Sequence, residues 1–300
     1  MKKALLSMAV IAIFSCTKES TEENRDSLQT SSEWFNEPII GYEMPQKDIA
    51  YLQALGFSDE YVSVTHTIDE SGDKRITYNI DDIMIYPEDL PAMLPKKSAS
   101  ETGHYRMPLI ASNGFTYRIY AFTNNNAKAN DAVNRAIDNY NLLFRQGKIG
   151  FNFQRLYNYD NRNLANIRIY FNDLGPRTTG RTGFPVRVNS SFVRPFSNIQ
   201  VNRRMITGST SRNYPTDRVE HTITHEIGHT MGLRHTDWFS RSSCANPNPE
   251  PWLGAVHIPG TPSQFSSNPI DANSLMNACS PLSAPGEFTA KDKIALDRTW

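Results

Sequence analysis

The run HEIGHTMGLRH at residues 225–235 constrains this 300-residue chain more than any other feature. His225 and His229 are four residues apart, so on a helix both imidazoles project from one face and can bind the same ion. Gly232 can take the left-handed conformation that ends a helix, which lets the chain turn back and bring His235 to that ion. Three neutral imidazoles leave a divalent ion such as Zn²⁺ its full charge and one open position. The sequence therefore predicts a metal centre with these three histidines as ligands.

Glu226 lies beside the first predicted ligand, where it cannot bind the ion in the same way but can reach a water molecule on it. We therefore predict that Glu226 is a general base. His221 stands four residues before His225, but no glutamate would be suitably placed for a His221–His225 pair, so we do not expect it to be a ligand. The predicted cofactor is one catalytic zinc ion, and nothing in the sequence indicates calcium.

The full pattern, His-Glu-x-x-His-x-x-Gly-x-x-His, resembles that of the metzincin zinc endopeptidases. The HEIGH core and the run HIPGTP at 257–262 resemble the bacterial dual-action HEIGH metallopeptidases, over roughly residues 115–300. The resemblance implies an α+β catalytic domain. Its α/β-like upper subdomain would hold a mixed twisted sheet and the active-site helix, and its irregular lower subdomain a methionine turn and a C-terminal helix.

The activity that the resemblance implies is hydrolysis of peptide bonds in extracellular or envelope proteins, through a metal-activated water with Glu226 as base. The alternative is a non-catalytic surface lipoprotein that binds protein or glycan and keeps the metal as a structural ion. Structural zinc is usually closed by four protein ligands. The three histidines and the adjacent carboxylate of this chain leave a position open, which favours catalysis.

The resemblance also implies several residues around the metal. Met276, in the run Ser-Leu-Met-Asn at 274–277, is the candidate for the turn methionine, as a packing floor and not a ligand. Residues 183–188 are the candidate edge strand for substrate, because Pro185 is tolerated only at sheet edges or bulges. Together with a wall at 257–262, this strand supplies the candidate substrate contacts Gly183, Phe184, Val186, His257 and Pro259. Thr236, Asp237 and Ala278 depart from the patterns of some metzincin subfamilies.

The chain before the catalytic domain reads as three segments. Residues 1–15 combine two lysines with a short apolar run and predict a lipoprotein signal peptide, whose ending Ile-Phe-Ser-Cys resembles a lipobox with Cys16 as the lipid acceptor. An ordinary signal peptide is the alternative. Residues 16–33, rich in Ser, Thr, Glu and Asn, predict a flexible tether. Residues 34–103 predict an N-terminal accessory or propeptide-like region plus linker, and residues 104–300 the catalytic domain.

Metzincin zymogens often block the zinc with a cysteine or an aspartate, and the 34–103 region offers aspartates at 81 and 82 but no cysteine. An inhibitory propeptide and a plain accessory region both remain open interpretations. If the region keeps the protein latent, trimming near Lys96 and Lys97 should raise activity.

The cysteines and the charge balance limit the location of the protein and the partners that it can have. Apart from Cys16, only Cys244 and Cys279 occur; in an exported protein they can form a disulfide, and separate buried thiols are the alternative. Basic and acidic residues balance at 31 each, so no positive excess points to nucleic acid. No apolar run approaches the ~20 residues of a membrane-spanning helix. We expect a monomeric exported bacterial lipoprotein of the outer membrane or cell surface, attached to the membrane only through its lipid anchor, with peptides or proteins as substrates.

Hydrophobic periodicity predicts the regular elements. The helices are expected over residues 46–55, 129–144, 217–231 and 290–296. The strands are expected over residues 76–80, 83–86, 115–122, 149–156, 167–171 and 199–201, with mostly loop from 176 to 195.

Overall fold

The computed structural model describes residues 37–55, 57–68, 74–94, 104–207, 214–245, 255–263, 265–267 and 269–300. Residues 33–300 form one compact unit. The predicted signal peptide, Cys16, the tether and the linker around Lys96 and Lys97 lie outside the described residues. Among the helices that are described, none has the length and apolar character needed to cross a membrane.

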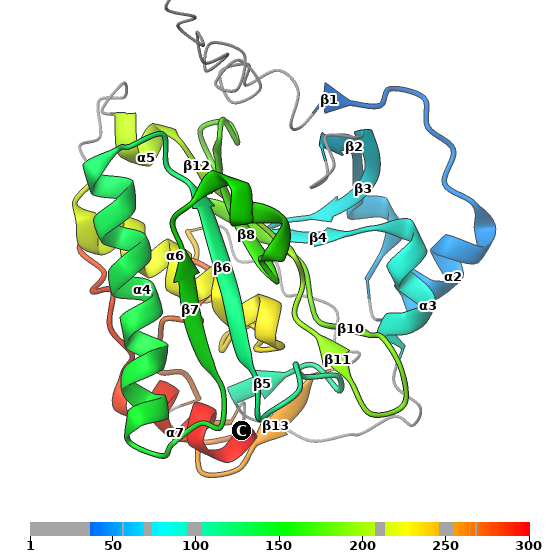
Figure 1. Ribbon diagram of the computed structural model, residues 1–300. Helices are drawn as coiled ribbons and strands as arrows, with labels where there is room; N and C mark the ends of the chain where they lie inside the picture. Colours follow the sequence, from blue (N-terminus) through cyan, green and yellow to red (C-terminus); the bar gives the residue numbers. More distant parts are fainter. Residues whose placement is uncertain are drawn as a thin grey trace, which may run out of the picture. The chain divides into compact units, whose positions relative to one another are not determined.

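A nine-stranded mixed sheet forms the centre of this unit (Figure 1). In pairing order its strands are β1 (Glu37–Pro38), β2 (Ser63–Ile68), β3 (Lys74–Ile80), β4 (Ile83–Ile85), β9 (Gly180–Thr182), β12 (Asn198–Asn202), β8 (Ile167–Asn172), β6 (Thr116–Phe122) and β7 (Asn152–Leu156). Strands β12, β8, β6 and β7 are parallel, whereas β9 runs antiparallel to β12. The predicted α+β class with a mixed sheet is confirmed.

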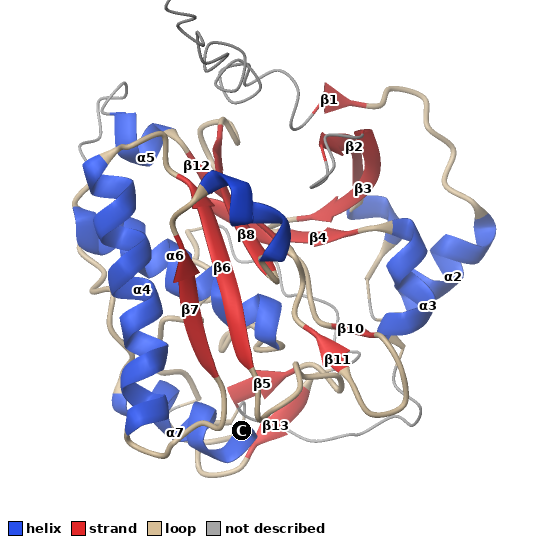
Figure 2. Cartoon of the chain, in the orientation of Figure 1, coloured by secondary structure: helices blue, strands red, loops and turns tan. Residues whose placement is uncertain are grey.

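The helices and short strands surround this sheet (Figure 2). The helices are α2 (Gln46–Ala54), α3 (Leu90–Met93), α4 (Ala127–Arg145), α5 (Arg204–Thr207), α6 (Thr216–Met231) and α7 (Ala290–Thr299). Short 3-10 turns occupy Asp59–Tyr61, Pro87–Asp89 and Tyr159–Leu164. Two small antiparallel sheets pair β10 (Val186–Arg187) with β11 (Val193–Arg194) and β5 (His104–Arg106) with β13 (Val256–Ile258).

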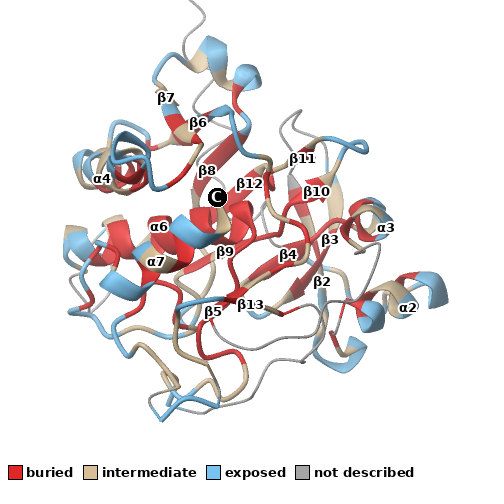
Figure 3. Cartoon of the chain, turned by 90° about the horizontal axis from the view of Figure 1, so that it is seen from below, coloured by how far each residue is buried: buried red, intermediate tan, exposed pale blue. Residues whose placement is uncertain are grey.

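Helices α4 and α6 pack against each other and against the sheet. The apolar stripe predicted for α4 is buried from Ala132 to Leu143, because it recurs at the helical period. Phe144, expected on the same stripe, is 41% exposed at the end of the helix. Helix α6 is buried along almost its whole length (Figure 3), and the Tyr140 hydroxyl of α4 donates to its Thr224 carbonyl at 2.9 Å. The helix that carries the histidines is therefore held inside the core.

The region before residue 104 shares the sheet of the catalytic part. Strand β4 lies beside β9, with Ile83 opposite Thr182. A second apolar core joins β3, β4, α2 and α3 to side chains from the later chain, among them Phe184 and Phe196. The domain boundary expected between residues 103 and 104 thus falls inside one compact unit. Whether residues 34–103 act as an accessory region or as a propeptide stays a prediction.

Candidate metal centre and active site

Helix α6 and the turn after it position the three predicted ligands. The helix begins at Thr216 after Pro215, one residue before the expected start, so Asp217 lies inside the first turn. It ends at Gly232, which adopts the left-handed conformation with φ 118°. A side chain there would also collide with the Leu109 carbonyl, 2.9 Å from an added Cβ. The bend at Gly232 brings His235 back to the face of the helix that carries the other two histidines.

The imidazoles converge through their Nε2 atoms. The His225 Nδ1–H donates to the Leu275 carbonyl and the His229 Nδ1–H to the Leu233 carbonyl, each at 2.7 Å. In both rings the Nε2 atom therefore keeps a lone pair that can bind a metal ion. The His235 Nε2 lies 3.1 Å from that of His229 and 3.3 Å from that of His225. Zn–N bonds of about 2.0–2.1 Å place tetrahedral ligand atoms about 3.4 Å apart. The donor atoms therefore fit a tetrahedral ion such as zinc.

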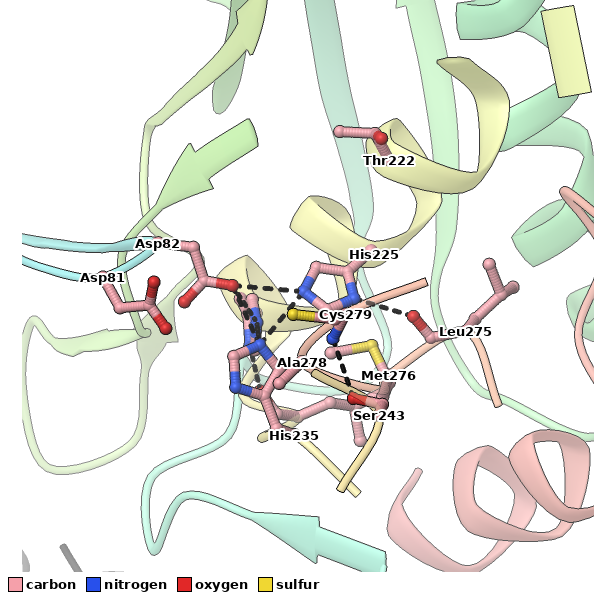
Figure 4. Close-up of polar contacts among 12 residues, drawn as sticks. Asp81, Asp82, Thr222, His225, His235, Ser243, Leu275, Met276, Ala278 and Cys279 are labelled. Carbon is pink, nitrogen blue, oxygen red and sulfur yellow. Dashed lines mark hydrogen bonds and ion pairs between the residues drawn. The ribbon is translucent and has the colours of Figure 1, made fainter. Parts of the chain in front are cut away.

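Asp82 brings a fourth donor atom to the same point (Figure 4). Its Oδ2 lies 2.9, 3.5 and 3.9 Å from the Nε2 atoms of His235, His225 and His229. The turn between β3 and β4 presents this carboxylate, and the Thr182 N–H donates to the Asp82 carbonyl at 2.9 Å. Of the two aspartates singled out in the sequence, Asp82 is thus the one that reaches the histidines.

The neighbouring Asp81 completes the turn without reaching the histidines. It adopts a left-handed backbone conformation with φ 57°, which aspartate tolerates better than most residues. Its carboxylate forms an ion pair with the Arg241 guanidinium. The turn is therefore anchored to the later chain by one aspartate while the other points into the metal centre.

The charges of this centre suit metal binding. Burial acts to raise the pKa of Asp82, but the adjacent His235, His225 and His229 outweigh it and hold that pKa well below its usual value. Burial, with the neighbouring His225 and His235, lowers the pKa of His229 well below its usual value. The aspartate is therefore anionic and His229 neutral at neutral pH, the states in which each binds a metal ion.

Glu226 stands beside the centre but outside the group of four metal-binding donors. Its side chain is 2% exposed, and its Oε2 has no hydrogen-bond partner among the described residues. Burial, followed by the charge of Asp82, raises the pKa of this carboxyl well above its usual value. A cavity of about 250 Å³ is lined by both Glu226 and His225. The carboxyl group thus faces open space next to the metal centre, as a general base must.

Gly180 of β9 makes room for this carboxyl group. A Cβ at Gly180 would lie 2.3 Å from the Glu226 Oε1 and 2.8 Å from the Thr222 Cγ2. We predict that Gly180→Ala displaces the carboxyl and lowers kcat/KM roughly 10- to 100-fold, while the metal content stays at the wild-type value. Gly150→Ala is a matched control, because its Cβ would also meet a flexible polar side chain, that of Asn113 at 2.5 Å. Equal activity of Gly180→Ala and Gly150→Ala would contradict this role of Gly180.

The segment containing Met276 packs against α6 beside the histidines. Met276 is 3% exposed, and a Cβ on Gly228 would lie 2.6 Å from its Sδ, so only glycine lets α6 approach the methionine this closely. The Thr236 N–H donates to the Met276 carbonyl at 2.7 Å. Thr236, which follows His235, therefore connects the loop that carries His235 to the segment that contains Met276.

Asp237 and a disulfide hold the same loop. The fully buried Asp237 carboxylate accepts from the Ala278 N–H at 2.9 Å and from the Ser243 hydroxyl at 2.6 Å. Cys244 and Cys279 form the disulfide that the sequence left open. In the chain-entropy model, a loop of this length contributes roughly 3–4 kcal/mol to the free energy of unfolding. Asp237 and Ala278, noted in the sequence only as departures, thus serve to position the centre.

The predicted substrate residues lie in other surroundings than expected. The strand that borders the centre is β9, which ends at Thr182, just before the predicted edge strand at 183–188. In that segment Phe184 and Val186 are buried, and a Cβ on Gly183 would lie 2.3 Å from the Met84 carbonyl. Strand β9 is paired on both sides, with β4 and β12, whereas the segment 183–188 lies outside the nine-stranded sheet and pairs through Val186–Arg187 with β11. Its role as the edge strand for substrate stays a prediction.

His257 and Pro259 do not line the cavity beside Glu226. His257 belongs to β13, where it lies opposite Tyr105 of β5, and Pro259 follows that strand. The cavity wall facing α6 comes instead from residues 277–280, directly after the methionine turn. A role of His257 and Pro259 in substrate binding stays a prediction.

A buried helix with two histidines one turn apart, a third histidine after a glycine bend and a free carboxylate beside them define a metal-dependent hydrolase. The family model of the dual-action HEIGH metallo-peptidases matches residues 78–300. The chain belongs to this family, and it is a metalloprotease. The match begins inside the region that precedes residue 104, so it includes the turn that carries Asp82.

Two solved structures of myroilysin are similar to part of the chain. One has 16% sequence identity and a TM-score of 0.35, covering 63% of this chain and 85% of the other. The second has 13% identity and a TM-score of 0.34, covering 61% of this chain and 78% of the other. No curated protein sequence matches the chain.

Proposed function

We propose that this protein is a zinc-dependent endopeptidase of the metzincin type, with His225, His229 and His235 as zinc ligands and Glu226 as general base. The observation that carries the proposal is the convergence of three Nε2 atoms, two of them 3.1 and 3.3 Å from the third. Backbone carbonyls hold two of the three rings in the tautomer that leaves Nε2 free. The centre is thus ordered by the protein before an ion arrives.

The residues of the chain then have distinct tasks in peptide hydrolysis. When bound, zinc supplies a Lewis acid that polarises a carbonyl oxygen and acidifies water. Glu226 accepts the proton of the attacking water and passes it to the leaving amine. The antiparallel strand β9 is the place where an extended peptide would pair, by β-strand addition.

We also propose that residues 34–103 are an inhibitory segment. The Asp82 carboxylate stands at the fourth vertex of the histidine centre, 2.9 Å from the His235 Nε2. Strand β4 pairs with β9, where the substrate would lie. Both the vertex and the edge strand are therefore occupied by the N-terminal region, and cleavage near Lys96 and Lys97 should release them.

The proposed location rests on the sequence alone. We propose that the protein is exported as a lipoprotein, acylated on Cys16, and acts in the cell envelope on extracellular or envelope proteins. The support is the basic, apolar and lipobox-like order of residues 1–16.

Casein hydrolysis with and without a chelator tests the catalytic proposal. We expect the full chain, nicked with a lysine-specific protease, to cleave casein, to lose this activity with a chelator and to regain it with one equivalent of zinc. Metal analysis should show one zinc ion per chain. A nicked protein that holds zinc and cleaves no casein, gelatin or library peptide would instead favour a structural metal in a binding lipoprotein.

A further inference from the structure

The cavity beside Glu226 extends away from the metal centre along α6. His225 and Arg218 both line it, and their separation of seven positions corresponds to two helical turns, roughly 10 Å along the axis. Residues 177–180 and 277–280 also line it. A side chain that enters this cavity from a peptide at the metal centre would therefore point toward Arg218.

Arg218 brings a charge without a counter-charge into the wall of this cavity. Its side chain is 6% exposed, and no carboxylate of the described residues forms an ion pair with it. Its guanidinium donates to the Thr222 hydroxyl at 3.3 Å and to the Ser280 carbonyl at 3.4 Å, while its Nε has no partner among the described residues. Burial lowers the pKa of Arg218 to about 10, so the group stays charged at neutral pH. A buried charge of this kind is costly unless a counter-ion joins it.

Apart from Glu226, the proposed general base, the other charged side chains around the cavity already have counter-charges or lie in water. Arg241 pairs with Asp81, and the Asp82 carboxylate lies against the histidines. Arg177 is exposed to solvent at the rim. Asp81 and Asp82 therefore border the cavity, where Asp81 offsets the charge of Arg241 and Asp82 lies against the histidines. Among the described arginines that line the cavity, Arg218 is the one that is buried and has no carboxylate paired with it.

We propose that this cavity is a specificity site, in which Arg218 binds the carboxylate of a Glu or Asp side chain next to the scissile peptide bond. The inference rests on the proposed endopeptidase function and names its substrate class. A guanidinium binds a carboxylate through two parallel N–H···O bonds, which suits an anionic side chain better than a neutral one of equal size.

His221 supplies the strongest competing interpretation. Its Nδ1–H donates to the Pro285 carbonyl at 2.7 Å, and its Nε2 lines the cavity without a partner among the described residues. A glutamine amide could donate to this nitrogen and accept from Arg218. An amide would leave the guanidinium charge uncompensated, so the carboxylate is favoured, and a comparison of Glu with Gln decides between them.

The test starts from a peptide that the full chain cleaves after it has been nicked with a lysine-specific protease, with each residue flanking the cleaved bond replaced in turn by Glu and by the isosteric Gln. The ratio of the two kcat/KM values, taken in one zinc-loaded preparation, does not depend on the fraction of active molecules. At one flanking position we expect a Glu-to-Gln ratio of roughly 10 to 100. Arg218→Gln should bring this ratio near one, Arg218→Lys should keep part of it, and Arg218→Glu should favour a Lys peptide. Arg145→Gln, which removes an exposed arginine from the end of α4, should leave the ratio unchanged.

A second readout separates this inference from the catalytic proposal. The zinc-loaded Glu226→Gln full chain, nicked in the same way, should bind the labelled Glu peptide more tightly than the Gln peptide by a similar factor, measured by fluorescence anisotropy. Cleavage of both peptides with a ratio near one, or a ratio that survives Arg218→Gln, would overturn the Arg218 site and leave the peptidase intact. If Glu226→Gln binds the Glu peptide preferentially but the chain that retains Glu226 cleaves neither peptide, the result would support the Arg218 site and contradict the catalytic proposal.

Discussion

Glu226→Gln should retain one zinc ion per chain and lose about 10³-fold or more in kcat/KM toward a peptide substrate. The three ligand nitrogens come from other side chains, and two of the rings are fixed by backbone carbonyls that the substitution does not touch. Glutamine has nearly the same volume as glutamate, so the buried site should keep its packing. What it cannot do is accept a proton from water and return it to the leaving amine. Metal analysis and peptide kinetics on the same sample measure the two effects separately.

The matched control for this substitution lies on the same helix. Glu220→Gln changes a carboxylate that is also buried but accepts from Asn139 at 2.9 Å and pairs with Arg135, away from the histidines. It should keep the activity within a few-fold of wild type. If Glu226→Gln holds zinc and cleaves as fast as this control, another group is the base.

Asp82→Ala should raise the peptidase activity of the intact, un-nicked chain at least about tenfold. The physical reason is competition for one position: an anionic oxygen at the fourth vertex excludes the water molecule that the reaction needs. Because Asp82 and the histidines belong to one chain, the effective concentration of this carboxylate is high, and free substrate competes poorly. The initial rate of cleavage of a fluorogenic peptide, before any self-processing is visible on a gel, measures the effect.

Two further samples make this prediction strict. Asp59→Ala removes an exposed acidic residue from the same N-terminal region and should stay as inactive as the wild-type chain. Wild-type protein nicked near Lys96 and Lys97 should reach the activity of Asp82→Ala. Equal rates from the intact wild type, Asp82→Ala and the nicked chain would show that residues 34–103 are a plain accessory region.

The elements that could be predicted are those whose signal is local. Helix α4 follows from an apolar stripe at the helical period, and α7 from Thr289 and Asp292, which form a capping box. The bend after α6 follows from Gly232, because the left-handed conformation there favours glycine. The short strands between residues 176 and 195 were not predicted by periodicity, because two or three residues carry no readable alternation. The six-residue strand β2 was missed as well.

The parts of the site that could not be predicted depend on contacts between distant residues. Asp82 and His235 are 153 residues apart, and nothing near Asp82 in the sequence distinguishes it from Asp81. Gly180 and Arg218 owe their roles to what β9 and residues 277–280 place opposite them. The acid at Asp237, two residues after His235, was a signal that could have been used, since an aspartate beside a predicted metal centre needs partners when it is buried.

By itself, the sequence determined which three histidines converge and which carboxylate stands beside them, because helical spacing and one glycine are enough to bring the imidazoles to a common point. It also determined the core of α4, since burial follows periodicity. Only the tertiary structure decided which aspartate meets the histidines, which strand borders them and which arginine is left without a counter-charge. Those outcomes depend on sheet pairing and on the packing of α6 against the methionine turn, and long-range packing of this kind leaves no local pattern in the chain.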